Sequence, residues 1–432
     1  MARIKRLAKE GSWIVAGQFA AVAGALVLVR VLTEHLDPEQ YGQLALGLTV
    51  AGLMNQVVMG GITAGIGRFY SIAAEKSDLL GYLKASRELM GYATLAVGSI
   101  ALSLIVGLVW TGQGQWLGLA VAVLIYSVLS AYNAALSGIQ NAARQRAVVA
   151  LHGGMDAWLK IGLAAGVMVW LGSSSTAVVF GYACSSLLVI GSQFVFLRRL
   201  IKCPNKPSET DNQWKHQMWV YSWPMVAGGL FNWSYYASQR WALELFITSG
   251  DVGHFYALTQ IAYSPISMAA GMFMSFLTPI LFAKAGAATD HDRIRNTHRV
   301  VIRIALIGFG FTLLFAGISV FIHGYIFRLL VASEYRQMSM YMPYVILSAG
   351  IFQVSLALGV IIAVENQTRR FLPLAIIGNG GIAALNFYLT YLWGMQGLIA
   401  SMVIGAAIHC TWMLKIVIKN VNRVKIKGNT WA

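Results

Sequence analysis

The chain is poor in acidic residues and in charge altogether. It has 16 Asp and Glu against 32 Lys and Arg, and charged residues make up only 11% of its 432 positions. A soluble domain of this size needs more charge than that to cover its surface. The period-two alternation of an outer-membrane barrel is also absent. The hydrophobic residues, 57% of the chain, come in blocks of about 20, long enough to cross a ~30 Å hydrocarbon core as helices. We therefore expect an all-α polytopic membrane protein.

Cysteine is also scarce, and it lacks the spacing of a metal site or a disulfide framework. Two of the three cysteines, Cys184 and Cys410, lie inside apolar blocks, and Cys203 lies in a hydrophilic segment. Histidines inside apolar blocks, such as His152, are isolated in the sequence. We find no phosphate-binding glycine loop, no nucleophile elbow and no paired metal ligands. The sequence therefore predicts neither an enzyme nor a metal or other cofactor.

The apolar blocks predict twelve membrane spans, six in each half of the chain. Their approximate limits are Gly11–Thr33, Gln43–Ile66, Gly91–Thr111, Trp116–Gly138, Val148–Leu171, Ala177–Leu197, Met218–Ile247, Gly253–Phe282, Arg299–His323, Tyr341–Val364, Phe371–Leu392 and Met395–Ile418. The segments on the outer side are short, the longest being Gly324–Met340, and none could house a catalytic domain.

The basic residues are distributed very unevenly between the two sides. With these spans, 27 of the 32 Lys and Arg fall on the side of the termini, and only Arg328 and Arg336 fall on the other. This is the pattern of the positive-inside rule, so both termini should be cytoplasmic, in a bacterial inner membrane. It explains the net charge of +16 without nucleic acid as a partner. The remaining three, Arg30, Lys160 and Arg240, lie inside spans.

A basic, proline-containing segment divides the chain in the middle. We predict an N-terminal six-helix bundle at 1–200, a cytoplasmic hinge at 201–216 and a C-terminal six-helix bundle at 217–432. The halves resemble each other weakly: Trp13 and Trp223 open similar helices, which each carry an arginine towards the outer end, Arg30 and Arg240. Because each half has an even number of spans, such repeats would be parallel.

Charges inside the spans are candidate functional residues, because a charge at the bilayer centre costs at least ~2.5–3.5 kcal/mol and rarely faces lipid. Asp156 and Lys160 lie four residues apart on the fifth span, so they share a helix face and can pair. They could form an internal ion pair that lowers the cost of both charges. Alternatively, Asp156 could bind a coupling ion, a proton or sodium, while Lys160 contacts a phosphate.

Arginines near the span ends allow two interpretations as well. Arg30 and Arg240 could extend to the outer headgroups, and Glu244 offers Arg240 a local partner and is a second candidate for ion coupling. However, a guanidinium also suits a phosphate, which it binds in a bidentate manner while remaining charged. Arg68, at the inner end of the second span, is a weaker candidate because positive-inside placement explains it fully.

Uncharged polar residues form two helical stripes. The stripe on the fourth span consists of Tyr126, Ser130, Asn133, Ser137 and Gln140. On the eleventh span, Asn379, Asn386 and Thr390 share a face. Such residues commonly bond helix to helix, but the longer stripe fits a surface that lines an aqueous cleft, and Asn133 is a candidate substrate contact. Pro265, near the middle of the eighth span, should kink that helix.

Three local motifs resemble a known family. GSWIVAGQ at the start of the first span, Leu28–Leu46 and GIGRFYS (Gly65–Ser71) are similar to the polysaccharide-biosynthesis branch of the multidrug/oligosaccharidyl-lipid/polysaccharide (MOP) exporter superfamily. Members of this branch include Wzx-type flippases, which move undecaprenyl-diphosphate-linked oligosaccharides to the outer leaflet. The resemblance implies two six-helix bundles around a cationic central cavity and an alternating-access mechanism.

We therefore expect a flippase for exopolysaccharide or O-antigen repeat units. Its substrate would be a lipid-linked oligosaccharide, with a polymerase and other polysaccharide-assembly proteins as candidate partners. A drug/cation antiporter of the same fold is the first alternative. It should have a net acidic cavity, whereas the spans here hold Arg30, Lys160 and Arg240 against Asp156 and Glu244. A membrane glycan polymerase or ligase is the second alternative, which the short outer loops disfavour.

The topology can be tested with reporter fusions. We expect fusions at Asp37, Gly114 and Ser174 to report a periplasmic location, and those at Asp78 and Gln145 a cytoplasmic one, because the basic residues cluster beside the second group. A cytoplasmic signal from Ser174 would contradict the six-plus-six division.

Overall fold

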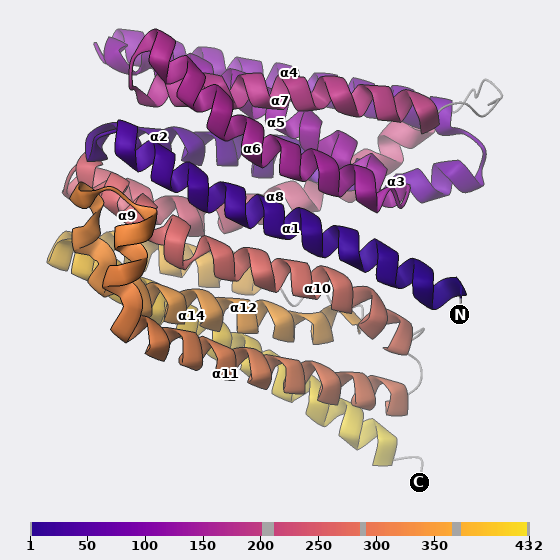
Figure 1. Cartoon of the computed structure of the whole chain (residues 1–432). Coiled ribbons are helices and arrows are strands. Elements are labelled where there is room, and N and C mark those ends of the chain that lie inside the picture. Colours follow the sequence, from indigo (N-terminus) through magenta and orange to yellow (C-terminus); the bar gives the residue numbers. More distant parts are fainter. Residues whose placement is uncertain (1, 201–210, 286–290, 365–372, 430–432) are drawn as a thin grey trace. The chain divides into compact units, whose positions relative to one another are not determined.

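The structure is a computed structural model that describes residues 2–200, 211–285, 291–364 and 373–429. All regular structure in these residues is helical, as Figure 1 shows. Helices satisfy their own backbone hydrogen bonds, which an apolar solvent requires of any spanning segment. The all-α membrane fold expected from the apolar blocks is therefore confirmed.

The helices follow one another with short connections. In chain order they are α1 (Ala2–His35), α2 (Pro38–Leu53), the π-helix η1 (Met54–Met59), α3 (Gly60–Glu75), α4 (Leu79–Trp110), the short 3₁₀-helix η2 (Gly114–Trp116), α5 (Leu117–Ala142), α6 (Arg146–Leu171), α7 (Ser175–Leu200), α8 (Asp211–Phe246), α9 (Ser249–Ala262), α10 (Ser264–Ala285), α11 (His291–Leu330), the 3₁₀-helix η3 (Ser333–Tyr341), α12 (Met342–Val364), the π-helix η5 (Leu374–Asn379) and α14 (Gly380–Asn429).

Ten stretches of the described residues are long and apolar enough to cross a membrane. The last of them, Leu374–Asn420, contains two helices that meet at Trp393 and Gly394, where Gly394 has a φ of 56°. That left-handed backbone conformation favours glycine, and it ends one span and begins the next. Together with α8, which is 36 residues long, the helices match the twelve predicted spans.

Two spans are interrupted near the middle. The kink predicted at Pro265 is confirmed: α9 ends at Ala262 and α10 begins at Ser264, with Tyr263 in a turn between them. The corresponding span of the first half contains no proline after Pro38 at its start, yet it is interrupted near the middle by η1, which the sequence did not predict. Single turns of π-helix are rare and are frequently found at functional sites.

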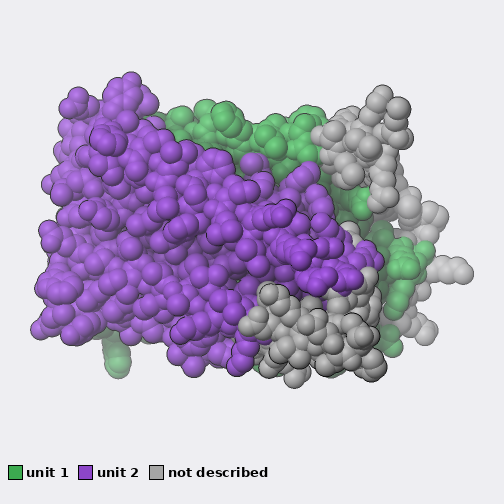
Figure 2. Space-filling model, turned by 90° about the horizontal axis from the view of Figure 1, so that it is seen from below, with its two compact units in different colours: residues 1–233 green, residues 234–432 purple. Residues whose placement is uncertain are grey.

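The chain forms two compact units, residues 1–233 and residues 234–432 (Figure 2). The division falls inside α8 rather than in the predicted hinge. Residues 201–210 of that hinge lie outside the described residues, and residues 211–216 form the first turns of α8. The first part of α8 belongs to unit 1 because it packs along α2, η1 and α3.

Glycines allow this close packing. A Cβ atom added at Gly65 would lie 2.5 Å from the Ser222 hydroxyl oxygen, and one added at Gly61 would lie 2.6 Å from a methyl carbon of Val226. Further along α8, the Trp233 indole donates a hydrogen bond to the Thr49 carbonyl oxygen at 2.8 Å. Therefore α8 runs antiparallel to the second span, in contact with it over several turns.

Trp214 anchors the beginning of α8. Its side chain is 4% exposed, and its indole N–H donates to a carboxylate oxygen of Asp78 at 2.7 Å. Asp78 also caps α4 by accepting from the Gly81 amide. The Trp214 ring makes edge contacts with Phe69 and Tyr82, with centroids 6.4 Å apart in both cases. Residues 211–216, which the sequence analysis assigned to the hydrophilic hinge, are therefore helical and pack through Trp214 where α3 connects to α4.

Each unit is organised around its fourth span. In unit 1, α5 contacts α2, α3, α4, α6 and α7, and in unit 2, α12 contacts α9, α10, α11 and α14. Both central helices contain fully buried serines, Ser127 in α5 and Ser348 and Ser355 in α12. Because α5 and α12 are each the fourth span of their half, their similar central role supports the internal repeat expected from the sequence.

Replacing Trp214 with alanine should destabilise unit 1. The change removes a buried aromatic side chain, for which roughly 3–5 kcal/mol is typical, and leaves the Asp78 carboxylate without its indole donor. Thermal unfolding of the protein in detergent measures the effect. Trp219→Ala on the same helix is the matched control, because Trp219 is 52% exposed. Equal losses for both variants would show that Trp214 is not an anchor.

Candidate functional site

The charges inside unit 1 meet where α5, α6 and α7 pack together. Lys160 and Asp156 lie one turn apart on α6, and the Lys160 ammonium is 2.5 Å from a carboxylate oxygen of Asp156. The other carboxylate oxygen accepts a hydrogen bond of 3.2 Å from the Ser185 hydroxyl on α7. The ion pair considered in the sequence analysis therefore forms. Its two side chains are 19% and 21% exposed.

Two tyrosines complete the surroundings of the ammonium. Lys160 Nζ lies 5.5 Å from the centroid of the Tyr126 ring on α5 and 5.8 Å from that of Tyr182 on α7. The two rings are themselves 5.8 Å apart and tilted by 57°. Both rings are within the ~6 Å at which an aromatic face attracts a cation. We call Tyr126, Asp156, Lys160, Tyr182 and Ser185 the lysine cluster.

His152 extends the polar face of α6 by one more turn. Its side chain is buried, with one ring nitrogen 2.8 Å from the Val148 carbonyl oxygen and the other 3.0 Å from the Ser192 hydroxyl. By proximity in the sequence alone, this histidine is isolated. The signal that could have found it was its spacing, because His152, Asp156 and Lys160 follow one another at intervals of four.

The polar stripe on α5 bonds to neighbouring helices. The buried Gln193 of α7 donates from its amide nitrogen to the Asn133 side-chain oxygen at 2.6 Å and to the Ser137 hydroxyl at 3.0 Å. Ser130 accepts from the Asn55 amide at 3.0 Å, and Asn55 lies in the π-helix η1. Most of this stripe therefore serves contacts between helices of unit 1, including the one to the irregular turn of the second span.

The stripe nevertheless contains an unsatisfied group. The Gln140 side chain is fully buried, and among the residues that the structure describes neither its amide nitrogen nor its oxygen has a hydrogen-bond partner. Leaving a buried polar group unpaired costs about 1–3 kcal/mol, and such groups commonly bond to a buried water. The stripe that begins at the lysine cluster with Tyr126 thus ends in a polar group suited to water.

The other two basic candidates of unit 1, Arg30 and Arg68, have no described contact with the lysine cluster. Arg30 pairs with Glu34 one turn further along α1, and its side chain is 34% exposed. Arg68 is exposed on α3. The sequence did not identify Glu34 as the partner of Arg30, although the spacing of four residues is the usual one for helix ion pairs.

In unit 2, Arg240 lies over an aromatic ring. Its guanidinium carbon is 4.6 Å from the centroid of Tyr256, whose hydroxyl accepts a hydrogen bond of 2.6 Å from Gln260. Glu244, one turn along α8 from Arg240, accepts from the Ser249 hydroxyl with both oxygens, at 2.9 and 2.8 Å. The carboxylate of Glu244 thus bonds to the start of α9.

The eleventh-span stripe is a packing contact of unit 2. The buried Asn386 donates to the Ser238 hydroxyl at 2.8 Å and accepts from the Ser401 hydroxyl at 2.7 Å. Thr390 donates to the Asn386 carbonyl oxygen. These bonds join α8 to both halves of α14, which is the common use of polar residues inside membrane proteins.

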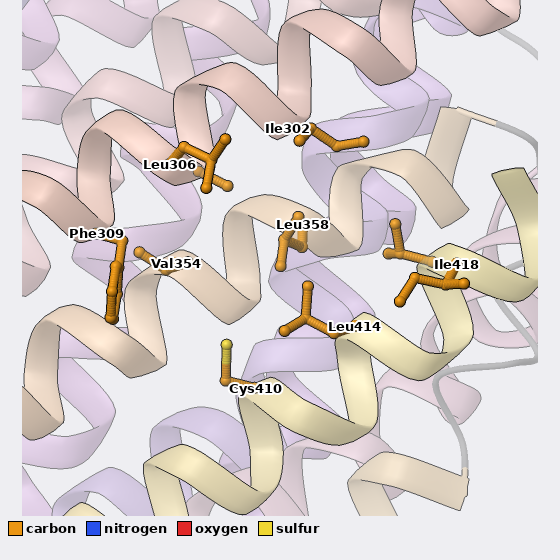
Figure 3. Close-up of a pocket in the computed structure, with 10 residues that line it drawn as sticks. Ile302, Leu306, Phe309, Val354, Leu358, Cys410, Leu414 and Ile418 are labelled. Carbon is orange, nitrogen blue, oxygen red and sulfur yellow. The ribbon is translucent and has the colours of Figure 1, made fainter.

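A groove of about 430 Å³ lies between α11, α12 and α14 (Figure 3). Its lining is apolar, with Leu306 and Phe309 from α11, Leu358 from α12, and Cys410 and Leu414 from α14 among the contributing side chains. The sequence analysis did not identify this groove, because its lining residues come from three separate spans. Within the described ranges, no group of three or more His, Cys, Asp or Glu could hold a metal ion.

Comparison with solved structures defines the class of the fold. The chain resembles an inward-facing multidrug-resistance MATE transporter of the MOP superfamily with a TM-score of 0.65 and 13% identity, over 95% of this chain and 99% of the other. It resembles a MOP-superfamily transporter from Pyrococcus furiosus, described as having a binding pocket of reverse polarity, with a TM-score of 0.64, 15% identity and 96% and 97% coverage. For the lipid II flippase MurJ the TM-score is 0.64, the identity 13%, and the coverage 96% and 90%. The protein has the fold of the MOP-superfamily transporters.

The sequence then places the chain within this class. A family model described as polysaccharide biosynthesis protein matches residues 7–285, and the chain belongs to that family. No curated protein matches the sequence. The resemblance noted in the first motifs is thereby confirmed.

A double-mutant cycle would separate the two possible roles of Asn133. We expect Asn133→Leu and Gln193→Leu to show a coupling of about 0.6 kcal/mol and at most about 1.7 kcal/mol, typical of hydrogen bonds between membrane helices. The free energies come from unfolding of the protein in detergent. If Asn133 also contacts substrate, adding Asn133→Leu to the Gln193→Leu variant will reduce transport further. Unchanged transport would leave Asn133 with a packing role alone.

Proposed function

We propose that this protein is a flippase that moves polyprenyl-diphosphate-linked oligosaccharides, of the undecaprenyl type, from the inner to the outer leaflet of a bacterial inner membrane. The transported repeat units would serve exopolysaccharide or O-antigen synthesis. Membership in the polysaccharide biosynthesis family supports the glycan, and the fold shared with the MurJ lipid II flippase supports a lipid-linked substrate. The proposed function is transport, with both termini in the cytoplasm and a glycan polymerase as a candidate partner.

The observation that carries this proposal is the lysine cluster. A diphosphate headgroup needs positive charge inside the membrane, and Lys160 supplies an ammonium that is paired with Asp156, on a side chain that is 19% exposed. Charge-assisted hydrogen bonds to phosphate are stronger than neutral ones, and a surrounding of low dielectric strengthens them further. The polyprenyl chain can stay in lipid during the movement, so the protein has to shield only the headgroup.

The two arginines are the other candidate phosphate contacts. Arg30 and Arg240 occur at corresponding points of the first helix in each half, and each carries a planar fork that fits a phosphate. Arg240 is positioned by its contact with Tyr256. We propose that alternating access brings the headgroup from one side to the other, as in transporters built from repeats.

A drug/cation antiporter is the second candidate, favoured by the likeness to MATE transporters. Such a protein needs acidic groups that can accept a cation from the substrate. Here Asp156 already holds the Lys160 ammonium, and the two carboxylate oxygens of Glu244 share the single hydroxyl proton of Ser249. The charges of the described spans therefore favour an anionic substrate.

The arginines provide a test of the flippase itself. The wild-type protein, reconstituted in vesicles, should move a polyprenyl diphosphate with a fluorescent sugar between leaflets, as measured by quenching with an impermeant reductant. Arg30→Ala and Arg240→Ala should each slow this movement by about tenfold or more, because a hydrogen bond to a charged group contributes roughly 1.5–3 kcal/mol. Lysine at either position should restore it in part, since it keeps the charge but not the planar fork.

Arg328→Ala is the control, because Arg328 is exposed near the predicted outer end of α11. It should leave the movement unchanged. Failure of the wild-type protein to move the lipid, together with transport of an organic cation, would replace the flippase with the antiporter. Full activity of both arginine-to-alanine variants would restrict the arginines to anchoring at the headgroups.

A further inference from the structure

The lysine cluster contains one positive and one negative side chain, held where few other charges are near. Asp156 and Lys160 neutralise each other on α6, and the neighbouring helices contribute only the hydroxyls and ring faces of Tyr126, Tyr182 and Ser185. From α1, which also packs against α6, residues 11–29 supply no ionisable side chain. His152 lies one turn away on α6 with both ring nitrogens engaged.

Such a site tolerates only one counter-ion for its ammonium. An ion removed from water is costly unless it is paired, and breaking a buried pair leaves an uncompensated charge. If a phosphate approaches Lys160, the ammonium faces two anions, Asp156 and the phosphate. One of the two anions must then leave, or lose its charge by taking up a proton.

We propose that Lys160 exchanges its counter-ion, passing from Asp156 to a phosphate of the substrate, and that Asp156 takes up one proton when this happens. This inference rests on the proposed function, since it takes the substrate to be an anionic diphosphate. The charges at Lys160 balance for one of the two negative charges of the diphosphate: a neutral pair, Lys160⁺ with Asp156⁻, becomes Lys160⁺ with phosphate⁻ beside a neutral Asp156 carboxylic acid. The charge of the second phosphate takes no part in this exchange. One phosphate charge and one proton thus enter together and leave together.

The neighbouring side chains suit both states of this exchange. The Tyr126 and Tyr182 rings attract the ammonium whichever anion it holds, so they keep Lys160 in place when the carboxylate becomes neutral. The Ser185 hydroxyl donates to Asp156 now, and it can accept from the protonated acid because a hydroxyl is both donor and acceptor. A cluster that served only as a static ion pair would not need this adaptability.

The geometry also favours a proton over a sodium ion as the coupled species. The Lys160 ammonium lies 2.5 Å from one carboxylate oxygen of Asp156 and supplies no oxygen ligand for a metal cation. The remaining contacts of the carboxylate come from the single hydroxyl of Ser185, whereas hard cations collect several oxygen ligands. A proton needs only one oxygen of the carboxylate.

The exchange can be measured, because the binding of the anion and the binding of the proton to Asp156 are thermodynamically linked. If binding of the anion takes up one proton, then the proton and the anion strengthen each other's binding by the same factor. The dissociation constant for the anion should therefore rise by about tenfold per pH unit over the pH range in which binding takes up one full proton. The probe must keep a constant charge in this range. An N-acetylglucosamine ester of a short polyprenyl diphosphate does so, because both of its phosphates are esterified.

The experiment is calorimetric titration of this probe into the full-length protein in detergent, in buffers of different ionisation enthalpy. For the wild-type protein we expect uptake of about one proton per probe bound. Asp156→Asn should still bind the probe, with proton uptake near zero and an affinity that no longer depends on pH. Lys160→Gln should bind it at least tenfold more weakly. Sodium should change none of these values.

Glu88→Gln is the matched control, since Glu88 forms an ion pair of 2.6 Å with Lys215 in the same unit and lies outside the cluster. It should leave proton uptake unchanged. Binding by the wild-type protein without proton uptake, or unchanged uptake in Asp156→Asn, overturns the exchange and leaves the flippase standing. Should the wild-type protein fail to bind the probe at all, the anionic substrate is wrong and both proposals fall. The wild-type titration decides the matter even if a variant does not fold.

Discussion

A charge inside the membrane must have a partner, and this constraint governs the arrangement of the polar residues in both units. Lys160 is held by Asp156 and two tyrosine faces, and Arg30 by Glu34. The same constraint applies to uncharged groups, so Asn386 and Gln193 each bond across helix boundaries. Since the pairings between helices fix the rotation of one helix against the next, these few polar residues help to specify how the apolar helices pack.

The helices pack closely where small residues face each other, and the second span of each half has an irregular turn. The first part of α8 approaches α3 closely at Gly61 and Gly65, and Trp214 fastens its beginning to the cap of α4. By contrast, the second span of each half is interrupted, by the π-helix η1 in unit 1 and by the turn at Tyr263 in unit 2. Interrupted helices are places where spans can bend, and a transporter that works by alternating access must bend somewhere.

The lysine cluster connects this packing to the proposed transport. It joins three helices of unit 1 through one ammonium, so a change in the ammonium's counter-ion also changes contacts between α6 and α7. Binding energy from the headgroup could thereby act on helix packing, which is the link that alternating access requires. The apolar groove of unit 2 lacks such charges and therefore offers no comparable coupling.

The sequence alone predicted the all-α membrane fold, the twelve spans and the kink at Pro265, and it offered the pairing of Asp156 with Lys160 as one of two possibilities. These follow from hydropathy, helix spacing and backbone chemistry, which act within a span or between neighbours in the chain. It could not determine that Tyr182, Ser185 and Gln193 would complete the polar contacts of α5 and α6, nor that residues 211–216 would dock through Trp214. Those contacts join residues 22 to 136 positions apart, and only the rotation and packing of the folded helices brings their side chains together.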